Sequence, residues 1–192
     1  MNVKKLISKT FQRFSRLTLS TEPLPPKAVV IGAPHTSNWD GVLMAIAFWD
    51  VERPFKFLVK DSLLHGPVSP IVRWVGGIGV DRKSPHGLVD SIAERAREAD
   101  EFTLIIAPKG TRAKKEFWKS GFYHIAYKAD IPVVLGYIDG EAKKYGWAHS
   151  IRLTGDMKAD MDVIRAFYEG KKGINPERGI VPRLRGEDEV EA

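Results

Sequence analysis

A histidine and an aspartate stand five residues apart in the segment His35–Asp40, which reads HTSNWD. If this segment forms a turn between a strand and a helix, the aspartate can accept a hydrogen bond from one imidazole nitrogen and leave the other nitrogen free to act as a base. The alternative interpretation is structural: Asp40 caps the following helix, and His35 only completes the turn. His35 is therefore a candidate general base, and the choice between the two interpretations depends on the residues around the pair.

Two further segments carry cations next to glycine. Residues 76–82 read GGIGVDR and residues 108–112 read PKGTR. Gly110 permits an unusual backbone conformation, and Thr111 and Arg112 offer donors suited to a phosphate group. Neither segment has the spacing of a dinucleotide fingerprint or of an NTP-binding P-loop, and a Gly-x-Ser-x-Gly nucleophile motif is absent from the sequence. For the first segment, the alternative is an ordinary surface pair of an aspartate and an arginine.

Strands and helices are predicted to alternate after residue 27. Hydrophobic patterning predicts strands at residues 28–33, 54–59, 77–80, 102–107, 131–138 and 147–153, and helices at residues 38–51, 69–75, 84–99, 120–129 and 155–168. This alternation predicts an α/β fold: a single domain with a largely parallel mixed sheet, flanked by helices on both faces.

The candidate residues come at the carboxyl ends of predicted strands. His35, Lys60, Arg82 and the segment 109–112 each follow a strand. Ligands bind at this edge of open α/β sheets. We therefore expect one base and at least three cations to meet in one crevice. That arrangement is suited to activating a hydroxyl group on an anionic, phosphate-bearing molecule.

The first 20 residues differ from the rest of the chain in charge. They hold five basic residues and no acid, so that of the net charge of +6 only +1 belongs to the other 172 residues. Apolar residues recur at helical spacing, and residues 1–20 are therefore predicted to form a basic amphipathic helix that lies on an anionic membrane. The alternative is a helix packed on the domain with its lysines in water. The predicted organisation continues with a proline-rich linker at 21–27, the main domain at 28–170 and a loose, mixed-charge tail at 171–192.

Composition excludes several classes of protein. The 192 residues are 43% hydrophobic and 28% charged, which is typical of a globular domain. The lack of cysteine excludes a disulfide scaffold, a thiol nucleophile and a thiolate metal site. Because the positive charge is concentrated in one segment, a nucleic-acid-binding surface is disfavoured. No apolar run reaches the roughly 18 residues that a membrane span needs, and no secretory signal sequence is expected.

The motifs His-x-x-x-x-Asp, Gly-x-x-Val-Asp-Arg and Pro-x-Gly-Thr-Arg, followed by Ile-Pro-Val-Val at 131–134, resemble the PlsC-like glycerolipid acyltransferases, the 1-acylglycerol-3-phosphate acyltransferase superfamily. The resemblance runs from about residue 28 to residue 139, and GAPHTSNWD is similar to the compact bacterial members. It implies the glycerolipid acyltransferase fold and a role in phospholipid biosynthesis. His35 would be the general base and Asp40 its orienting partner, while the acceptor hydroxyl attacks an acyl thioester directly. The acceptor phosphate would be bound by Arg82, Gly110, Thr111 and Arg112, with Lys60 and Lys109 nearby.

The resemblance also implies partners and a location. The donor would be acyl-CoA or acyl carrier protein, and the acceptor a lysophospholipid. Together with the basic amphipathic pattern of residues 1–20, which predicts contact with an anionic membrane surface, the resemblance implies a peripheral protein at the cytoplasmic face of the inner membrane; the alternative is a cytoplasmic protein. No cofactor, metal or nucleic acid is implied. Four aromatic residues beside the motifs are candidates for lining an acyl tunnel, although such residues are more often plain core: Trp39, Phe117, Trp118 and Phe122.

One position departs from the family's pattern. The third motif usually has a glutamate where this chain has Lys109. A lysine cannot accept a hydrogen bond, and it repels Arg112, so we expect weaker positioning of the acceptor rather than failed proton transfer. On this interpretation, Lys109→Glu raises turnover. The alternatives are that Lys109 is an added phosphate ligand for a more anionic acceptor, or that the protein is a non-catalytic or weakly active lipid-binding relative.

Overall fold

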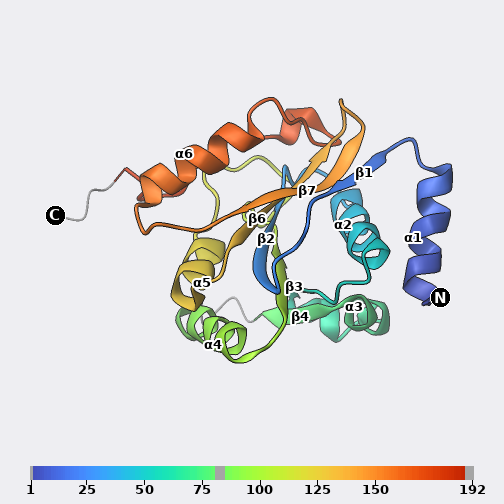
Figure 1. Ribbon diagram of the computed structural model, residues 1–192, viewed down its shortest axis with the longest axis horizontal. Helices are drawn as coiled ribbons and strands as arrows, with labels where there is room; N and C mark the ends of the chain where they lie inside the picture. Colours follow the sequence, from blue (N-terminus) through green and yellow to red (C-terminus); the bar gives the residue numbers. More distant parts are fainter. Residues whose placement is uncertain (1, 81–84, 189–192) are drawn as a thin grey trace.

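A computed structural model describes residues 2–80 and 85–188 (Figure 1). Within them, one seven-stranded sheet has the order β1-β7-β6-β2-β5-β3-β4. Strands β2 to β6 run parallel to one another, β7 runs antiparallel to β6, and β1 is parallel to β7. The strands are β1 (Thr18–Thr21), β2 (Lys27–Ala33), β3 (Lys56–Lys60), β4 (Gly77–Val80), β5 (Phe102–Ile106), β6 (Val133–Asp139) and β7 (Lys144–Ile151). The helices are α1 (Val3–Phe14), α2 (Trp39–Asp50), α3 (Ser69–Val75), α4 (Pro85–Glu98), α5 (Gly121–Ala129) and α6 (Met157–Tyr168), with short 3₁₀ helices at Asp61–Leu64 and Pro176–Arg178.

Helices cover both faces of the sheet. Helices α1, α2 and α3 lie on one side, and α4, α5 and α6 lie on the other (Figure 1). Successive residues of β2 point to opposite faces. Val29 and Ile31 therefore enter the core beneath α4, α5 and α6, while Ala28 and Val30 enter the core beneath α2. Because β2 is buried on both faces, it gives rigid support to the loop that follows it. The predicted α/β fold is confirmed.

The prediction for the N-terminal 20 residues is wrong in one respect. The helix ends at Phe14, and Thr18–Thr21 form an edge strand that pairs with Lys144–Trp147 of β7. β-branched Thr18 and Thr21 favour this extended conformation, and Leu19 packs against the core beneath α2. The segment between β1 and β2 is therefore shorter than the linker predicted at 21–27.

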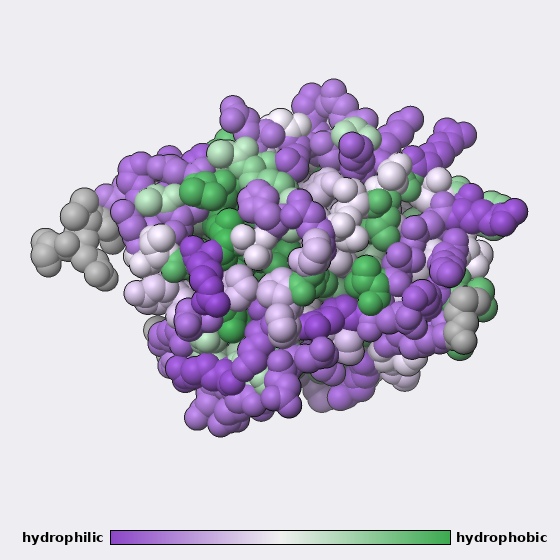
Figure 2. All heavy atoms as spheres, in the orientation of Figure 1, coloured by the Kyte–Doolittle hydropathy of each residue, from purple (hydrophilic) through white to green (hydrophobic). Residues whose placement is uncertain are grey.

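Helix α1 packs on the domain through Phe11, which lies against the core beneath α2, and through polar side chains. Ser8 is fully buried and donates to the carbonyl oxygen of Ile46 at 2.9 Å, and Gln12 donates to Asp50 at 2.8 Å. The apolar residues Leu6 and Phe14 remain exposed, Phe14 at 80%. Figure 2 shows apolar side chains on the outer edge of the molecule where α1 lies. Among the described residues, no helix is both long and apolar enough to cross a membrane.

The C-terminal segment, here residues 170–188, is packed on the domain, whereas a loose tail was predicted from residue 171. Gly140 donates to the carbonyl oxygen of Lys172 at 2.6 Å, and Trp118 donates to that of Arg183 at 2.7 Å. A parallel β-bridge joins Trp118 to Leu184, which is itself buried. The segment has little regular secondary structure, so these long-range hydrogen bonds and Leu184 hold it in place.

Candidate active site

His35 and Asp40 form a hydrogen-bonded pair beyond the carboxyl end of β2. His35 Nδ1 lies 3.1 Å from Asp40 Oδ2. A carboxylate only accepts hydrogen bonds, so Nδ1 of the neutral imidazole carries the proton and Nε2 keeps its lone pair. Asp40 is 5% exposed, whereas His35 lines an open cavity. The pair is therefore built to present a base to a molecule in the cavity.

The same carboxylate holds the loop between β2 and α2. Asp40 Oδ2 also accepts hydrogen bonds from the backbone N–H groups of Thr36 at 2.6 Å and Ser37 at 2.8 Å. Asp40 lies in the first turn of α2, where the helix dipole favours negative charge. Asn38 occupies the N-cap position of α2 but makes no side-chain capping bond. The structural and chemical interpretations of Asp40 are thus compatible, since one oxygen orders the loop and orients the imidazole.

The segment 108–112 follows β5, the strand beside β2. Gly110 has a φ of +66°, in the left-handed region that glycine adopts without strain. Thr111 is half-buried and Arg112 is exposed, which leaves both side chains open to a ligand at this edge of the sheet. Lys109 differs from them because it is only 4% exposed.

Lys109 is directed at the C-terminal segment. Its Nζ donates to the carbonyl oxygen of Arg178 at 2.7 Å. Burial lowers the pKa of Lys109, an effect that the carboxylate of Asp40 opposes and the guanidinium of Arg178 reinforces. Lys109, which stands where the family usually has a glutamate, therefore makes its contacts inside the protein, between the Asp40 loop and the C-terminal segment.

Lys60 and Arg82 are the two other cations that were predicted at the site. Lys60 is exposed at the end of β3, which is separated from β2 by β5. Arg82 lies outside the described residues. The structure thus places His35, Asp40 and the segment 108–112 beyond the carboxyl ends of the neighbouring strands β2 and β5, with Lys60 at the end of the next strand, β3.

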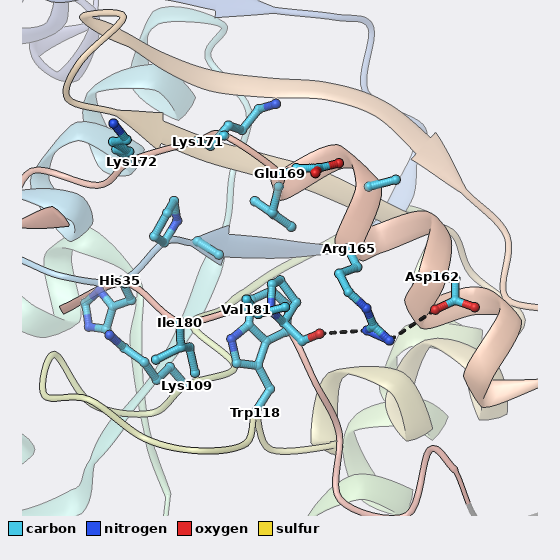
Figure 3. Close-up of a pocket in the computed structure, with 17 residues that line it drawn as sticks. His35, Lys109, Trp118, Asp162, Arg165, Glu169, Lys171, Lys172, Ile180 and Val181 are labelled. Atoms are coloured by element: carbon cyan, nitrogen blue, oxygen red, sulfur yellow. Dashed lines mark hydrogen bonds and ion pairs between the residues drawn. The ribbon is translucent and has the colours of Figure 1, made fainter. Parts of the chain in front are cut away.

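A cavity of about 660 Å³ opens beside His35 (Figure 3). Its volume is within the range of about 300–1,000 Å³ that is common for small-molecule sites. Its walls come from the loops that carry His35 and Lys109, from α6 and from the C-terminal segment. The residues that line it are Ala33, Pro34, His35, Lys109, Trp118, Asp162, Arg165, Ala166, Tyr168, Glu169, Gly170, Lys171, Lys172, Gly179, Ile180, Val181 and Pro182.

The four predicted acyl-contacting aromatic residues are placed differently from one another. Trp118 lines the cavity. Phe122 is fully buried in the core and packs edge-on against Trp118, with ring centroids 6.2 Å apart, so it supports the wall from behind. Trp39 is exposed at the start of α2, and the ring of Phe117 lies 5.6 Å from the guanidinium of Arg185.

Sequence reasoning missed the contribution of the C-terminal half of the cavity. Arg165 of α6 donates to the carbonyl oxygen of Pro182 at 2.8 Å and to Asp162 at 3.1 Å (Figure 3). Ile180 and Val181 supply apolar wall. The sequence signal for these residues is weak because the segment lacks a helical or strand periodicity. The short apolar run from residue 180 to 182 is the feature that could have drawn attention to it.

Comparisons with known proteins agree with this arrangement. The sequence profile of the family described as "Acyltransferase" matches residues 16–137. A protein of Mycoplasma pneumoniae named "Probable 1-acyl-sn-glycerol-3-phosphate acyltransferase" is 31% identical over 123 residues, which are 60% of this chain and 46% of the relative. A protein of the same name from Mycoplasma genitalium is 24% identical over 167 residues, which are 83% of this chain and 61% of the relative. The chain thus spans less than two thirds of the length of either relative.

A solved structure shares the fold. The crystal structure of the 1-acyl-sn-glycerophosphate (LPA) acyltransferase PlsC from Thermotoga maritima matches with a TM-score of 0.57 and 17% identity, over 86% of this chain and 77% of that chain. The family profile covers more than half of the chain, from β1 to β6, including both loops that carry the candidate residues. The chain therefore belongs to the acyltransferase family and has the fold of PlsC.

Proposed function

We propose that this protein transfers a fatty acyl group from an acyl thioester to the hydroxyl group of a lysophosphatidate-like acceptor in glycerolipid synthesis. The observation that carries the proposal is the His35–Asp40 pair, which presents an imidazole to a cavity large enough for a lipid chain. The names of the curated relatives support the choice of acceptor.

The residues support a direct transfer with His35 as the general base. Nε2 of His35 takes the proton of the acceptor hydroxyl while that oxygen attacks the thioester carbonyl carbon. A new C–O ester bond forms and the C–S bond breaks. The imidazolium then returns its proton to the departing thiolate, so that the products are an ester and a free thiol. Asp40 keeps Nδ1 protonated and stabilises the positive charge that His35 acquires.

We assign the acceptor phosphate and the acyl chain to different parts of the site. We assign the acceptor phosphate to Arg112 and Thr111, which are open at the sheet edge, with Lys60 and Arg82 as further candidates. Gly110 allows the loop its left-handed bend between Lys109 and Thr111. We assign the acyl chain to the cavity, where Trp118 and the apolar part of the C-terminal segment supply the wall.

Helix α1 is proposed to bind an anionic membrane surface. In most surface helices the apolar side faces the protein. Here Ser8 and Gln12 face it together with a single apolar residue, Phe11, whereas Leu6 and Phe14 face outward. Arg13 is also exposed on this helix. Apolar side chains among basic ones suit an interface of acyl chains and anionic headgroups. On this proposal the protein is peripheral, at the cytoplasmic face of the inner membrane.

The test is an acyl-transfer assay on the purified full chain. Lysophosphatidate is incubated with palmitoyl-CoA or palmitoyl acyl carrier protein, and both free thiol and phosphatidate are measured. Comparing the two donors identifies the carrier. His35→Ala is expected to lower turnover roughly 10²- to 10⁴-fold, the usual contribution of a general base. The matched control is His65→Ala, since His65 also pairs with an aspartate at 3.1 Å but is exposed on the surface.

Two results would contradict the proposal. Acceptor-dependent thiol release that survives His35→Ala would remove His35 from the reaction. Binding of lysophosphatidate without any acceptor-dependent thiol release from either donor would favour the second candidate, a lipid-binding relative without catalysis. The departure at Lys109 is the specific observation behind that candidate.

A further inference from the structure

The C-terminal segment 170–188 is attached to both loops that carry the candidate site. Asn175 donates its backbone N–H to Thr36 Oγ1 at 3.1 Å and its side-chain amide to the Thr36 carbonyl oxygen at 3.0 Å. Thr36 is the residue after His35. At Gly173 a Cβ atom would lie 2.5 Å from Thr36 Oγ1, so only glycine allows this close approach. Lys109 makes the second attachment, through Arg178.

The four residues that follow Arg178 form one wall of the cavity: Gly179, Ile180, Val181 and Pro182. This wall is fastened at both ends. At its start, the Lys109 ammonium holds the carbonyl oxygen of Arg178. At its end, Arg165 holds the carbonyl oxygen of Pro182, and Trp118 holds that of Arg183. Such a short span between fixed points can take few conformations, so the fastenings set how far the wall protrudes into the cavity.

The hydrogen bond from Lys109 to the Arg178 carbonyl oxygen is strong for a single contact. A hydrogen bond from a buried ammonium group is worth roughly twice one between neutral groups. A carboxylate at this position would face the same carbonyl oxygen without a proton to donate. Lys109 and Ile180 line the same cavity (Figure 3). Because Arg178 directly precedes the wall 179–182, a change in its hydrogen bond to Lys109 also moves the apolar side chains of that wall.

We propose that Lys109 is a positioning residue that fixes the wall 179–182, and that Ile180 in this wall selects the length of the acyl chain. The proposal rests on the assignment of the acyl chain to the cavity in the proposed function. Lys109 acts through the segment and takes no part in proton transfer. The lysine in place of the family's glutamate then serves specificity for the acyl chain, because it holds the C-terminal segment that crosses the site.

The experiment compares four variants of the full chain with the parent protein. Lys109→Met keeps the length of the side chain but removes the donor. Asn175→Ala weakens the other attachment, and Ile180→Phe fills the wall without touching either. The matched control is Lys115→Met, which makes the same chemical change at an exposed lysine of the loop that follows Gly110. Each protein is titrated with a fluorescent acyl-CoA, which is then displaced by saturated acyl-CoAs of eight to eighteen carbons. This readout needs no turnover.

A tight apolar pocket discriminates against one added methylene by roughly 10- to 200-fold. We therefore expect the parent protein to show a clear optimum of chain length. In Lys109→Met and Asn175→Ala, the ratio of affinities between the best donor and one two carbons longer should fall at least about fivefold. Ile180→Phe should move the optimum to shorter chains, and Lys115→Met should change neither. Hydrogen exchange at the backbone amides of Asn175, Arg178 and Gly179 should be at least about tenfold faster in Lys109→Met, because their segment opens more often.

Each contrary result overturns a stated part of the proposal. Unchanged amide exchange in Lys109→Met would mean that the lysine does not hold the segment. Faster exchange with an unchanged order of chain lengths would mean that the segment does not select the chain, as would an unchanged optimum in Ile180→Phe. Should Lys109→Met fail to fold, Asn175→Ala and Ile180→Phe decide the matter. If the parent protein binds donors selectively but never transfers the acyl group, the proposed function fails and this inference stands.

Discussion

Replacing Asp40 by asparagine tests the proposed catalytic pair with little change in shape. Asp40 Oδ2 accepts hydrogen bonds from His35 and from the backbone N–H groups of Thr36 and Ser37. The carbonyl oxygen of an asparagine placed there can accept the same three bonds. Its amide then takes the place of Oδ1, which is buried and has no hydrogen-bond partner among the described residues. The loop should keep its conformation, and the negative charge beside the imidazole is lost.

The size of the effect follows from that lost charge. Two unit charges about 4 Å apart interact by roughly 4 kcal/mol at the effective dielectric constant of a partly buried site. His35 and Asp40 are this close, but the proton is only partly transferred in the transition state, so about 2–4 kcal/mol of stabilisation should disappear. At 1.36 kcal/mol for each tenfold change, kcat should fall roughly 30- to 900-fold. This loss is severe, yet it is smaller than the upper range expected for His35→Ala.

The assay measures kcat and KM separately by thiol release, together with the melting temperature. Asp40 does not line the cavity, so KM for either substrate should change by less than about threefold, whereas kcat carries the loss. The matched control is Asp61→Asn, because Asp61 lies 3.1 Å from His65 in an exposed pair. Its kcat should stay within about twofold of the parent value, in keeping with the small energies of surface pairs.

Asp40 does not support catalysis in this way if folded Asp40→Asn keeps more than about a third of the parent kcat. The same holds if the loss appears entirely in KM, since that would make Asp40 a substrate-binding residue. An equal loss in Asp61→Asn would show that the measured effect does not depend on the contact between Asp40 and His35.

The other predictions use different measurements. Changing Leu6 and Phe14 of α1 together to glutamine should lower co-sedimentation with vesicles containing anionic lipid at least about tenfold, while Val163→Gln, an equally apolar exposed position on α6, should leave it unchanged. Lys109→Glu should lower the free energy of unfolding by about 2–5 kcal/mol in urea titrations, because it buries a second carboxylate near Asp40; equal or greater stability would contradict the assigned contact with the C-terminal segment. Asp160→Ala should cost at least about 3 kcal/mol by the same measurement, because buried Asp160 accepts hydrogen bonds from Tyr123 and from the loop before α6.

Local patterns were sufficient to predict most of the sheet and the contact between His35 and Asp40. The helix Ser69–Val75 and the strand Gly77–Val80 have the bounds expected from hydrophobic spacing, and they depend on neighbours close in sequence. His35 and Asp40 lie in one loop, so their contact follows from a strand-to-helix turn alone. The parallel order of the sheet then brings the segment 108–112 to the adjacent strand.

Contacts between distant residues could not be predicted in this way. Thr18–Thr21 has too few residues to show a strand pattern, and its conformation depends on the open edge of β7, which lies more than a hundred residues later in the sequence. The C-terminal segment has no periodicity, and its path is set by individual hydrogen bonds to Thr36, Lys109 and Trp118. A sequence pattern records neither the partners nor the direction of such bonds.

Lys109 shows how much this difference matters for function. From the sequence, a lysine in place of the glutamate means a charge reversal beside Arg112, and hence a weakened acceptor site. In the structure the ammonium is buried, points to the Arg178 carbonyl oxygen and shares its surroundings with the Asp40 carboxylate. A buried positive charge next to a buried negative one lowers the cost of burying each of them. Restoring the glutamate by itself would remove that compensation and leave the Arg178 carbonyl oxygen without its donor. Turnover should therefore fall in Lys109→Glu instead of rising, unless the C-terminal segment is changed with it.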